Sequence, residues 1–206
     1  MRAGVILAGG RSTRFGEADK AVAELAGTPM IRRVADRLAS VVDEVVVNGR
    51  SEQREAIEAA LEGLAAPPTY AADPEPDQGP LFGIRTGLAA ADADCAAVVA
   101  CDMPFVEPAL VEFLFDRVTD HDAAVPRIGD GWYQTTQAVY RTRPMIAACD
   151  AARDRGEGRI VAAFDDLDVR EVSEAEVLEH GPLETFDNIN TPEEFQDAVH
   201  RLSEAG

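Results

Sequence analysis

Short, continuously apolar runs alternate with longer stretches in which apolar residues recur every third or fourth position. Continuous runs of about four to eight apolar residues are typical of strands buried on both faces. The other spacing is typical of a helix with one inner face, as at Ile31, Val34, Ala35 and Leu38. Strands and helices therefore alternate through the first 120 residues. This order predicts a three-layer α/β fold, a mostly parallel sheet with helices on both faces.

The predicted elements follow directly from this pattern. Buried strands are expected at residues 4–8, 44–48 and 96–100, with a further strand at 169–172 and a short strand near Tyr70. Helices are expected from Thr28 and Pro29 onward, at residues 52–64, 81–91, 108–118 and 144–155, and from Thr191 and Pro192 onward.

Two of these helices have a recognisable start. Thr28 and Thr191 are each followed by proline, so that threonine would cap the helix and proline would take its first position. Glu194 stands three residues after Thr191, which predicts a capping box at the last helix.

A hairpin is expected to interrupt the parallel sheet. Residues 123–127 and 133–141 have strand character and flank Gly129-Asp130-Gly131, a strong turn signal. Ligands of mostly parallel sheets bind at the carboxyl ends of the strands, so the residues at those ends carry the functional information.

Length and composition limit the possible classes of protein. A chain of 206 residues with 46% hydrophobic residues suits one domain over residues 1–206. No run approaches 18 apolar residues, so we expect no membrane span. The first apolar run stops at Gly9 and Gly10, too early for a signal peptide. The three cysteines are widely spaced and suit neither a disulfide framework nor a zinc site, which predicts a cytoplasmic protein.

The chain is strongly acidic. Its 38 Asp and Glu residues against 19 Lys and Arg give a net charge of -19, spread along the whole chain without a basic run. Such a surface repels nucleic acids, which excludes DNA- and RNA-binding classes. Strong salt screens charges over about 3 Å at 1 M, so self-repulsion is tolerable in a salt-rich cytoplasm. The composition predicts a halophilic protein, with an ordinary acidic bacterial protein as the alternative.

The basic residues are unevenly divided. Eighteen of the 19 are arginine, and Lys20 is the single lysine. Lysine carries a compact, mobile charge that can follow a moving phosphoryl group more closely than a guanidinium can. We therefore predict that Lys20 has a function that arginine cannot perform. The alternative is that a lysine stands at this position by chance.

A glycine-rich loop follows the first strand. Gly9 and Gly10 let backbone N–H groups approach a ligand, while Arg11, Arg14 and Lys20 supply cations. This composition favours a phosphate cradle over a plain glycine turn. The glycine spacing matches neither a Walker loop nor the G-x-G-x-x-G dinucleotide fingerprint.

Polar residues also end the other strands. Asp102 follows the strand at 96–100 and is well placed to bind a divalent metal, with helix or turn capping as the alternative. Asn48 and Asp73 follow the next strands and could meet the same crevice or simply form turns. Asn188 and Asn190 precede the last helix, whose N-terminus favours an anionic group.

Taken together, these residues resemble the molybdenum cofactor guanylyltransferases. The resemblance rests on L-A-G-G-x-S-x-R-F-G-x-x-D-K (residues 7–20), V-V-V-N (45–48), G-P-L-x-G-I (79–84), C-D-M-P-F (101–105) and N-I-N-T-P-E-E (188–194). It spans nearly the whole chain. The first motif places the chain among nucleotidyltransferases with a Rossmann-like fold, and the last narrows it to this family.

The resemblance implies a reaction and a set of roles. Such enzymes join GMP from GTP to the terminal phosphate of molybdopterin carrying molybdenum, release diphosphate and use Mg²⁺. Implied GTP contacts are Leu7, Ala8, Gly9, Gly10, Lys20, Asn48, Asp73 and Asp102, with Asp77 as the alternative to Asp73. Arg14, Lys20 and Asp102 would carry catalysis, Asp102 would bind the metal, and Asn188 and Asn190 would lie near the acceptor. The role also implies transient contact with proteins that donate or receive the cofactor.

One segment departs from the family, and several rivals stay open. Where a proline-containing acceptor segment is expected, the chain has Tyr133-Gln134-Thr135-Thr136-Gln137. Transfer from CTP to the molybdenum cofactor, or transfer of a nucleotide to a sugar or corrinoid phosphate, would use the same loop and carboxylate. A non-catalytic nucleotide-binding protein on the same fold is the rival from another class.

The acidic composition gives a first prediction. If the charge is an adaptation to salt, the free energy of unfolding should rise from dilute buffer to multimolar KCl, because screening removes self-repulsion. Urea unfolding at a series of KCl concentrations measures this. Greatest stability in dilute buffer would contradict it.

Overall fold

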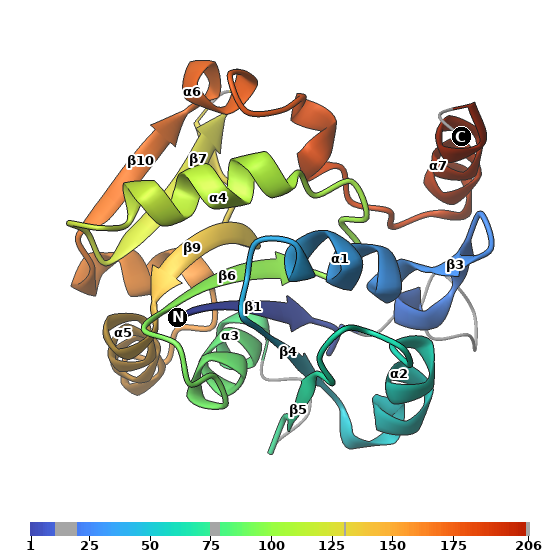
Figure 1. Ribbon diagram of the computed structural model, residues 1–206. Helices are drawn as coiled ribbons and strands as arrows, with labels where there is room; N and C mark the ends of the chain where they lie inside the picture. The colour runs from blue at the N-terminus through green and yellow to red at the C-terminus, as the bar shows by residue number, and fades with distance from the viewer. Residues whose placement is uncertain (11–19, 75–78, 130, 205–206) are drawn as a thin grey trace.

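The computed structural model describes residues 1–10, 20–74, 79–129 and 131–204. Its main feature is one mixed sheet with the strand order β10-β7-β9-β6-β1-β4-β5 (Figure 1). The strands are β1 (Arg2–Leu7), β4 (Glu44–Gly49), β5 (Thr69–Ala72), β6 (Cys95–Ala100), β7 (Ala123–Ile128), β9 (Gln137–Arg141) and β10 (Val169–Ser173). The neighbours β6-β1-β4-β5 run parallel, whereas β9 is antiparallel to both β6 and β7. The expectation of a mostly parallel sheet with a hairpin excursion is confirmed.

Helices cover both faces of the sheet, as the sequence predicted (Figure 1). One face carries α1 (Met30–Ala39), α2 (Arg54–Ala60), α4 (Pro108–Arg117) and α6 (Glu174–Leu178). The other face carries α3 (Pro80–Ala89), α5 (Thr142–Asp154) and the 3-10 segment Ile160–Asp166. In the described residues, no helix has both the length and the apolar character needed to cross a membrane.

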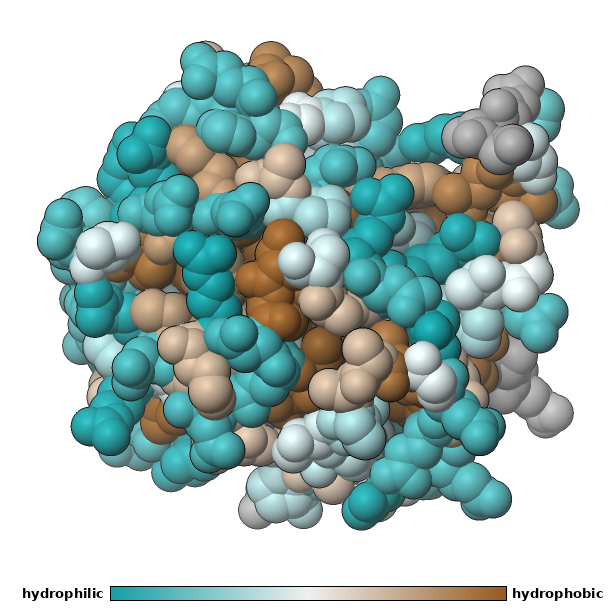
Figure 2. Space-filling view, viewed as in Figure 1, coloured by the Kyte–Doolittle hydropathy of each residue, from teal (hydrophilic) through white to brown (hydrophobic). Residues whose placement is uncertain are grey.

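The two faces bury two separate cores. Successive strand residues point to opposite faces, so that Ile6 and Val99 pack under α1 and α4, and Val5 and Val98 pack under α3 and α5. All four side chains are fully buried. Their continuous apolar character is what a strand covered on both faces requires. Outside, the face shown in Figure 2 is largely hydrophilic, as the acidic composition demands.

A smaller third core lies at one end of the molecule. There α7 (Pro192–Glu204) packs on the hairpin formed by β2 (Glu24–Leu25) and β3 (Thr28–Pro29). Leu25, Met30, Ile189 and Ala198 fill the contact and are fully or almost fully buried. In Figure 1, α7 stands beside β3, apart from the sheet. The Lys20 segment and the C-terminal segment therefore meet through a core of their own.

The expected cap at Thr28 is wrong. Thr28 pairs with Leu25 in the β2–β3 hairpin, across a turn in which Ala26 and Gly27 have φ of 49° and 75°. The helix starts two residues later at Met30, with Pro29 at the cap position and no side-chain cap. A two-residue turn with positive φ at both positions closes a hairpin tightly, and the Ala26-Gly27 pair is a weak sequence signal for it.

The expected strand at residues 133–141 is also wrong in one respect, because it is two strands. β8 (Trp132–Tyr133) pairs with β7, and β9 starts at Gln137. Between them the chain turns, since the N–H of Gln134 donates to the carbonyl of Pro126 and that of Gln137 donates to the carbonyl of Gln134. The helix expected at residues 52–64 is shorter as well: α2 ends at Ala60.

Other expectations at element ends are confirmed. Gly129 and Gly131 lie between β7 and β8, and the N–H of Gly131 donates to the carbonyl of Ile128; Asp130, the middle residue of the expected turn, lies outside the described residues. Thr191 and Glu194 form the capping box at α7, because the Glu194 carboxylate accepts from the N–H of Thr191 and the Thr191 hydroxyl accepts from the N–H of Glu194. The sequence pattern missed α6 and the 3-10 segment at 160–166, which are short.

A glycine on α3 allows this helix to approach the sheet closely. A Cβ on Gly87 would lie 2.4 Å from Cγ1 of Val5, which is fully buried in β1. Valine is restricted to few rotamers and cannot move aside. We therefore expect Gly87→Ala to lower the free energy of unfolding by about 1–3 kcal/mol, the usual cost of overpacking.

Urea unfolding at one fixed KCl concentration tests this expectation. Thr86→Ala, at the neighbouring position of the same helix, adds no atoms and is the matched control, expected to change stability by no more than about 0.5 kcal/mol. Equal stability of Gly87→Ala and the wild type would show that α3 does not depend on this contact.

Candidate active site

The ends of three neighbouring strands bring the candidate residues to one edge of the sheet. In the central strand β1, Leu7 pairs with Ala100 of β6 on one side and with Asn48 of β4 on the other. Residues that follow these positions therefore leave the sheet side by side, as expected for carboxyl ends of parallel strands. Asp102 comes two residues after Ala100, so Asn48 and Asp102 lie on opposite sides of the end of β1.

Asn48 forms the centre of the first half of this edge. Its side chain is 1% exposed, and its amide donates to Oδ1 of Asp73 at 2.7 Å and to the carbonyl of Ala71 at 3.2 Å. A Cβ on Gly9 would lie 3.0 Å from Oδ2 of Asp73, so the glycine loop passes directly over this pair. The structure thus joins Gly9, Asn48 and Asp73, which are far apart in the sequence.

A second glycine on α3 makes room for this arrangement. A Cβ on Gly83 would lie 2.6 Å from Oδ1 of Asn48. Only glycine at this position lets the helix pack against the asparagine amide without displacing it. Gly83 is part of the G-P-L-x-G-I motif, and this contact explains why the motif has glycine at that position.

Two side chains that sequence reasoning missed hold the start of the glycine loop. The Arg50 guanidinium donates to the carbonyls of Gly9 and Gly10 at 3.3 and 3.2 Å, and the Gln53 amide donates to the carbonyl of Ala8 at 3.1 Å. These donors neutralise carbonyl oxygens that would repel an anion. A cation immediately after the V-V-V-N strand was the available signal for Arg50; Gln53 had none.

The backbone at the end of β1 is partly used by the fold itself. The N–H of Ala8 donates to the carbonyl of Asn48 at 2.8 Å, and the carbonyl of Leu7 accepts from the N–H of Cys101 at 3.0 Å. Gly9 and Gly10, further out, are therefore better placed to meet a ligand than Leu7 and Ala8. Arg11, Arg14 and Asp77, which the sequence also singled out, lie outside the described residues.

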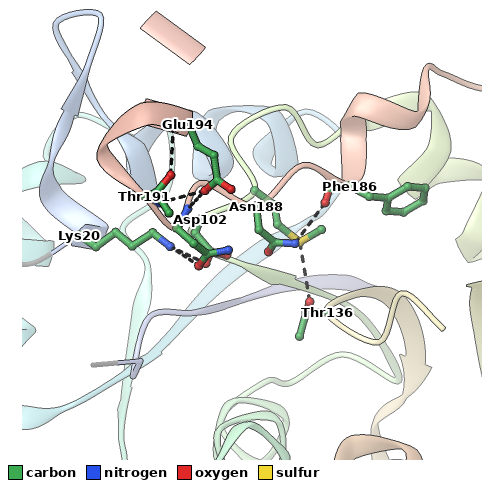
Figure 3. A network of polar contacts seen from close by, with 9 residues as sticks. Lys20, Asp102, Thr136, Phe186, Asn188, Thr191 and Glu194 are labelled. Carbon is green, nitrogen blue, oxygen red and sulfur yellow. Dashed lines mark hydrogen bonds and ion pairs between the residues drawn. The ribbon is translucent and has the colours of Figure 1, made fainter. Parts of the chain in front are cut away.

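Lys20 forms the centre of the second half of the edge. Its ammonium donates to Oδ2 of Asp102 at 2.8 Å and to Oδ1 of Asn190 at 2.9 Å (Figure 3). The lysine is only 7% exposed, so this charge is held largely out of water and between two oxygen acceptors. A charge that is largely removed from water has to be paired with acceptors, and Asp102 and Asn190 provide them here.

Asp102 has one oxygen left over. Its Oδ2 is bound to Lys20, but Oδ1 is buried and has no hydrogen-bond partner. A buried carboxylate oxygen without a partner is costly and calls for a cation or donor. In the described parts of the chain, no group of three or more acidic, cysteine or histidine side chains could hold a metal alone. A divalent ion at Asp102 would take most of its ligands from water and bound phosphates, as Mg²⁺ typically does.

The C-terminal segment completes this half. The N–H of Ile189 donates to the carbonyl of Asp102 at 2.9 Å, which sets Asn190 beside Lys20. Asn188 turns elsewhere, and its amide donates to the carbonyl of Phe186 at 3.2 Å. The structure therefore separates the two asparagines: Asn190 contacts the catalytic candidate, and Asn188 lies on the other side of Asp102 (Figure 3).

Glu194 supports this segment from α7. Its carboxylate accepts from the N–H of Asn190 at 2.6 Å and from that of Thr191 at 2.9 Å. The hydrogen bond from Asn190 is the largest cause that lowers the pKa of Glu194 below its usual value, and the positive charge of Lys20 adds to it. The capping box predicted from sequence thus also orients Asn190, which the sequence alone did not indicate.

Comparisons with known proteins agree with this geometry. A family model described as a MobA-like NTP transferase domain matches residues 4–170. A probable molybdenum cofactor guanylyltransferase of Natronomonas pharaonis is 48% identical over 202 residues, 98% of each chain. One of Haloferax mediterranei is 38% identical, covering 95% of this chain and 91% of the relative. The structure of molybdopterin-guanine dinucleotide biosynthesis protein A from Archaeoglobus fulgidus has the same fold, with a TM-score of 0.80, 24% identity and coverage of 99% and 100%.

These relatives also bear on the acidic composition. Natronomonas and Haloferax are halophiles, and their proteins match this chain over nearly its whole length. The prediction of a halophilic protein is confirmed in this way.

The lowered pKa of Glu194 gives a prediction at acid pH. A carboxylate whose pKa is lowered by folding stabilises the fold above its ordinary pKa, and this contribution is lost as the pH falls through the lowered pKa. We expect the NMR signals of the Asn190 and Thr191 amides to shift at a lower pH than an ordinary glutamate titrates. In Glu194→Gln this shift should disappear. A titration at the ordinary glutamate pKa would contradict the capping role.

Proposed function

The chain belongs to the MobA-like NTP transferase family, and on this premise we propose that it transfers GMP from GTP to the terminal phosphate of molybdopterin carrying molybdenum. Diphosphate is the second product. The observation that carries the proposal is the placement of the single lysine between Asp102 and Asn190, at the edge where strand ends meet. The names of the relatives supply the nucleotide and the acceptor.

The chemistry requires little covalent participation by the protein. An oxygen of the acceptor phosphate attacks the α-phosphorus of GTP, a new P–O bond forms, and the bond to the bridging oxygen of diphosphate breaks. A phosphate monoester is already anionic at neutral pH, so no general base is needed. Positioning and charge stabilisation then provide most of the rate.

Lys20 is suited to follow the charge that develops. Its ammonium is held in place by Asp102 and Asn190, and its flexible stem allows it to move from them to a phosphate oxygen. There it would stabilise the departing diphosphate, together with Arg14 of the glycine loop. A guanidinium has a rigid, planar fork and could not exchange partners within the same small space.

Asp102 would hold the metal. Its buried, unpartnered Oδ1 fits a cation ligand, and enzymes of this kind typically use a divalent ion. We propose Mg²⁺, which when bound would polarise the α-phosphoryl oxygens. The pairing of Oδ2 with Lys20 leaves Oδ1 as the oxygen that would contact the cation.

The other half of the edge would bind the nucleoside. Gly9 and Gly10 allow close approach of the backbone, and the Asn48–Asp73 pair lies directly beneath Gly9. Leu7 borders this site with its half-buried side chain, and Ala8 fixes the loop through Gln53. Base selection depends on a few such contacts.

The whole chain, residues 1–206, would act as one catalytic unit. A reaction that consumes GTP and passes a cofactor to other proteins belongs in the cytoplasm, and contacts with those proteins would be transient. The acidic surface fits partners other than nucleic acids or anionic membranes.

A turnover assay distinguishes this proposal from its rivals. The protein is incubated in high KCl with Mg²⁺, molybdopterin carrying molybdenum and each nucleoside triphosphate in turn, and diphosphate is measured. We expect release with GTP. Release with CTP alone would assign the cytidylyl reaction instead, and release only with sugar or corrinoid phosphates would assign another acceptor. Nucleotide binding without turnover on any acceptor would indicate a non-catalytic protein.

Variants of the charged pair give the matching prediction. We expect Lys20→Ala and Asp102→Ala each to lower kcat by about a hundredfold or more, because each removes a charge that stabilises the transition state. Lys20→Arg keeps the charge but should not restore the rate. Asp150→Ala, which breaks an ion pair with Arg85 away from the site, is the control and should leave kcat unchanged. Near-normal turnover in either alanine variant would remove that residue from the mechanism.

A further inference from the structure

The only tryptophan of the chain, Trp132, is exposed to solvent. Trp132 is 76% exposed, more than any other large hydrophobic side chain in the described residues. Tryptophan is large and apolar, so its exposure forgoes the stabilisation that burial would give. A flat, exposed indole is well suited to stack on a planar ring.

The short strand β8, which carries Trp132, pairs with the same edge of β7 as β9 does. Arg127 of β7 pairs with Ser173 of β10 and also with Tyr133 of β8, and these two partners must lie on opposite edges of β7. β8 is therefore on the edge that faces β9 and, beyond it, β6. The N–H of Ala100, at the end of β6, donates to the carbonyl of Thr136, just after β8. Trp132 thus lies at the end of the sheet where β6 finishes and Asp102 follows.

Trp132 lies on the face of the sheet that also carries the core leading to Asn188. Trp132 pairs with Ile128, and directly paired residues of antiparallel strands share a face. Ile128 packs against the core that contains Phe186, from which the chain continues to Asn188. In Figure 3, Asn188 and Thr136 lie beyond Asp102 as seen from Lys20. Asn188 and Thr136, which follows the Trp132 strand in the chain, therefore lie on the same side of Asp102.

The hairpin that carries Trp132 is firmly held. The Arg127 guanidinium donates to the carbonyl of Gly131 at 3.1 Å and to the Glu171 carboxylate at 2.9 Å, and it lies over the Tyr133 ring. The Tyr133 hydroxyl also donates to Glu171, and the N–H of Gly129 donates to Glu174 at 2.8 Å. Trp132 is therefore exposed next to residues that are tied to β10 and α6 by side-chain contacts.

The edge divides into two parts at Asp102. The glycine loop, Asn48 and Asp73 stand on the β1–β4–β5 side, where the nucleoside is placed by the proposed function. The acceptor must then extend over the β9–β7 side. We propose that Trp132 stacks on the planar pterin ring of the acceptor and supplies much of the affinity for it. This inference rests on the proposed function, and it assigns the acceptor contact to a residue outside the Asn188–Asn190 pair.

The single tryptophan provides a direct measurement. All tryptophan fluorescence comes from Trp132, so quenching by acrylamide reports its exposure alone. With metal-free molybdopterin at saturation, under anaerobic conditions and in high KCl, we expect the quenching constant to fall at least about twofold, because a stacked ring excludes acrylamide. GTP with Mg²⁺ should leave it unchanged. A quenching constant unaffected by the pterin would overturn the proposal.

Variants complete the test. Trp132→Ala should raise the Kd for molybdopterin by about tenfold, in the range of lost base–aromatic stacking, and Trp132→Phe should restore most of the affinity. The Kd for GTP should stay the same in both. Leu178→Ala, which removes another exposed hydrophobic side chain (55% exposed), is the control and should change neither value. A Kd for the pterin within twofold of the wild type in Trp132→Ala would refute the stacking role.

Two further outcomes have a definite meaning. A quenching constant that falls with protein concentration in the absence of ligand would assign Trp132 to contacts between copies of the chain and overturn the proposal. Acrylamide quenching of Trp132 and the Kd for molybdopterin both report binding, so they can be measured even if no GMP is transferred. Normal GMP transfer with an unshielded Trp132 would refute this inference alone, whereas shielding without transfer to any acceptor would refute the proposed function alone.

Discussion

The ammonium of Lys20 joins segments that lie far apart in the chain. Its partners Asp102 and Asn190 are 82 and 170 residues away in sequence. The three residues come from three different elements. Lys20 lies in the 3-10 turn Lys20–Val22 before the β2–β3 hairpin, Asp102 follows the buried strand β6, and Asn190 precedes α7. A nearly buried charge must be balanced where it stands, so the sheet, the hairpin and the C-terminal helix must all be in place before this pair can form. The small third core, centred on Leu25 and Ile189, provides that alignment.

The same edge is shaped by close packing as much as by charge. Gly83 and Gly87 lie one helical turn apart on α3, and each leaves room for a residue of a neighbouring strand, Asn48 and Val5. The first contact fixes the buried Asn48 amide near Gly9, and the second fixes the helix on the sheet. Stability and ligand geometry are therefore linked through one helix face, because protein interiors leave no space for an added methyl group.

The acidity of the molecule and the anionic nature of its ligands are compatible because they concern different places. The net charge of -19 describes a solvated surface adapted to salt. At the strand ends, Lys20 and Arg50 are paired with specific acceptors, and the carboxylate of Asp102 has one buried oxygen without a hydrogen-bond partner. Local arrangement decides what such a site attracts, since fields from distant surface charges are screened.

The sequence by itself determined the class of fold, the strand ends that matter and the singular position of Lys20. These conclusions follow from local rules. Continuous apolar runs predict buried strands, and a single lysine among arginines indicates a function specific to lysine. The tertiary structure alone decided which residues meet. The pairing of Lys20 with Asn190, the support from Arg50 and the break before Gln137 all depend on long-range contacts. Such contacts leave no periodicity in the chain, because they join residues whose spacing is set by how whole elements pack.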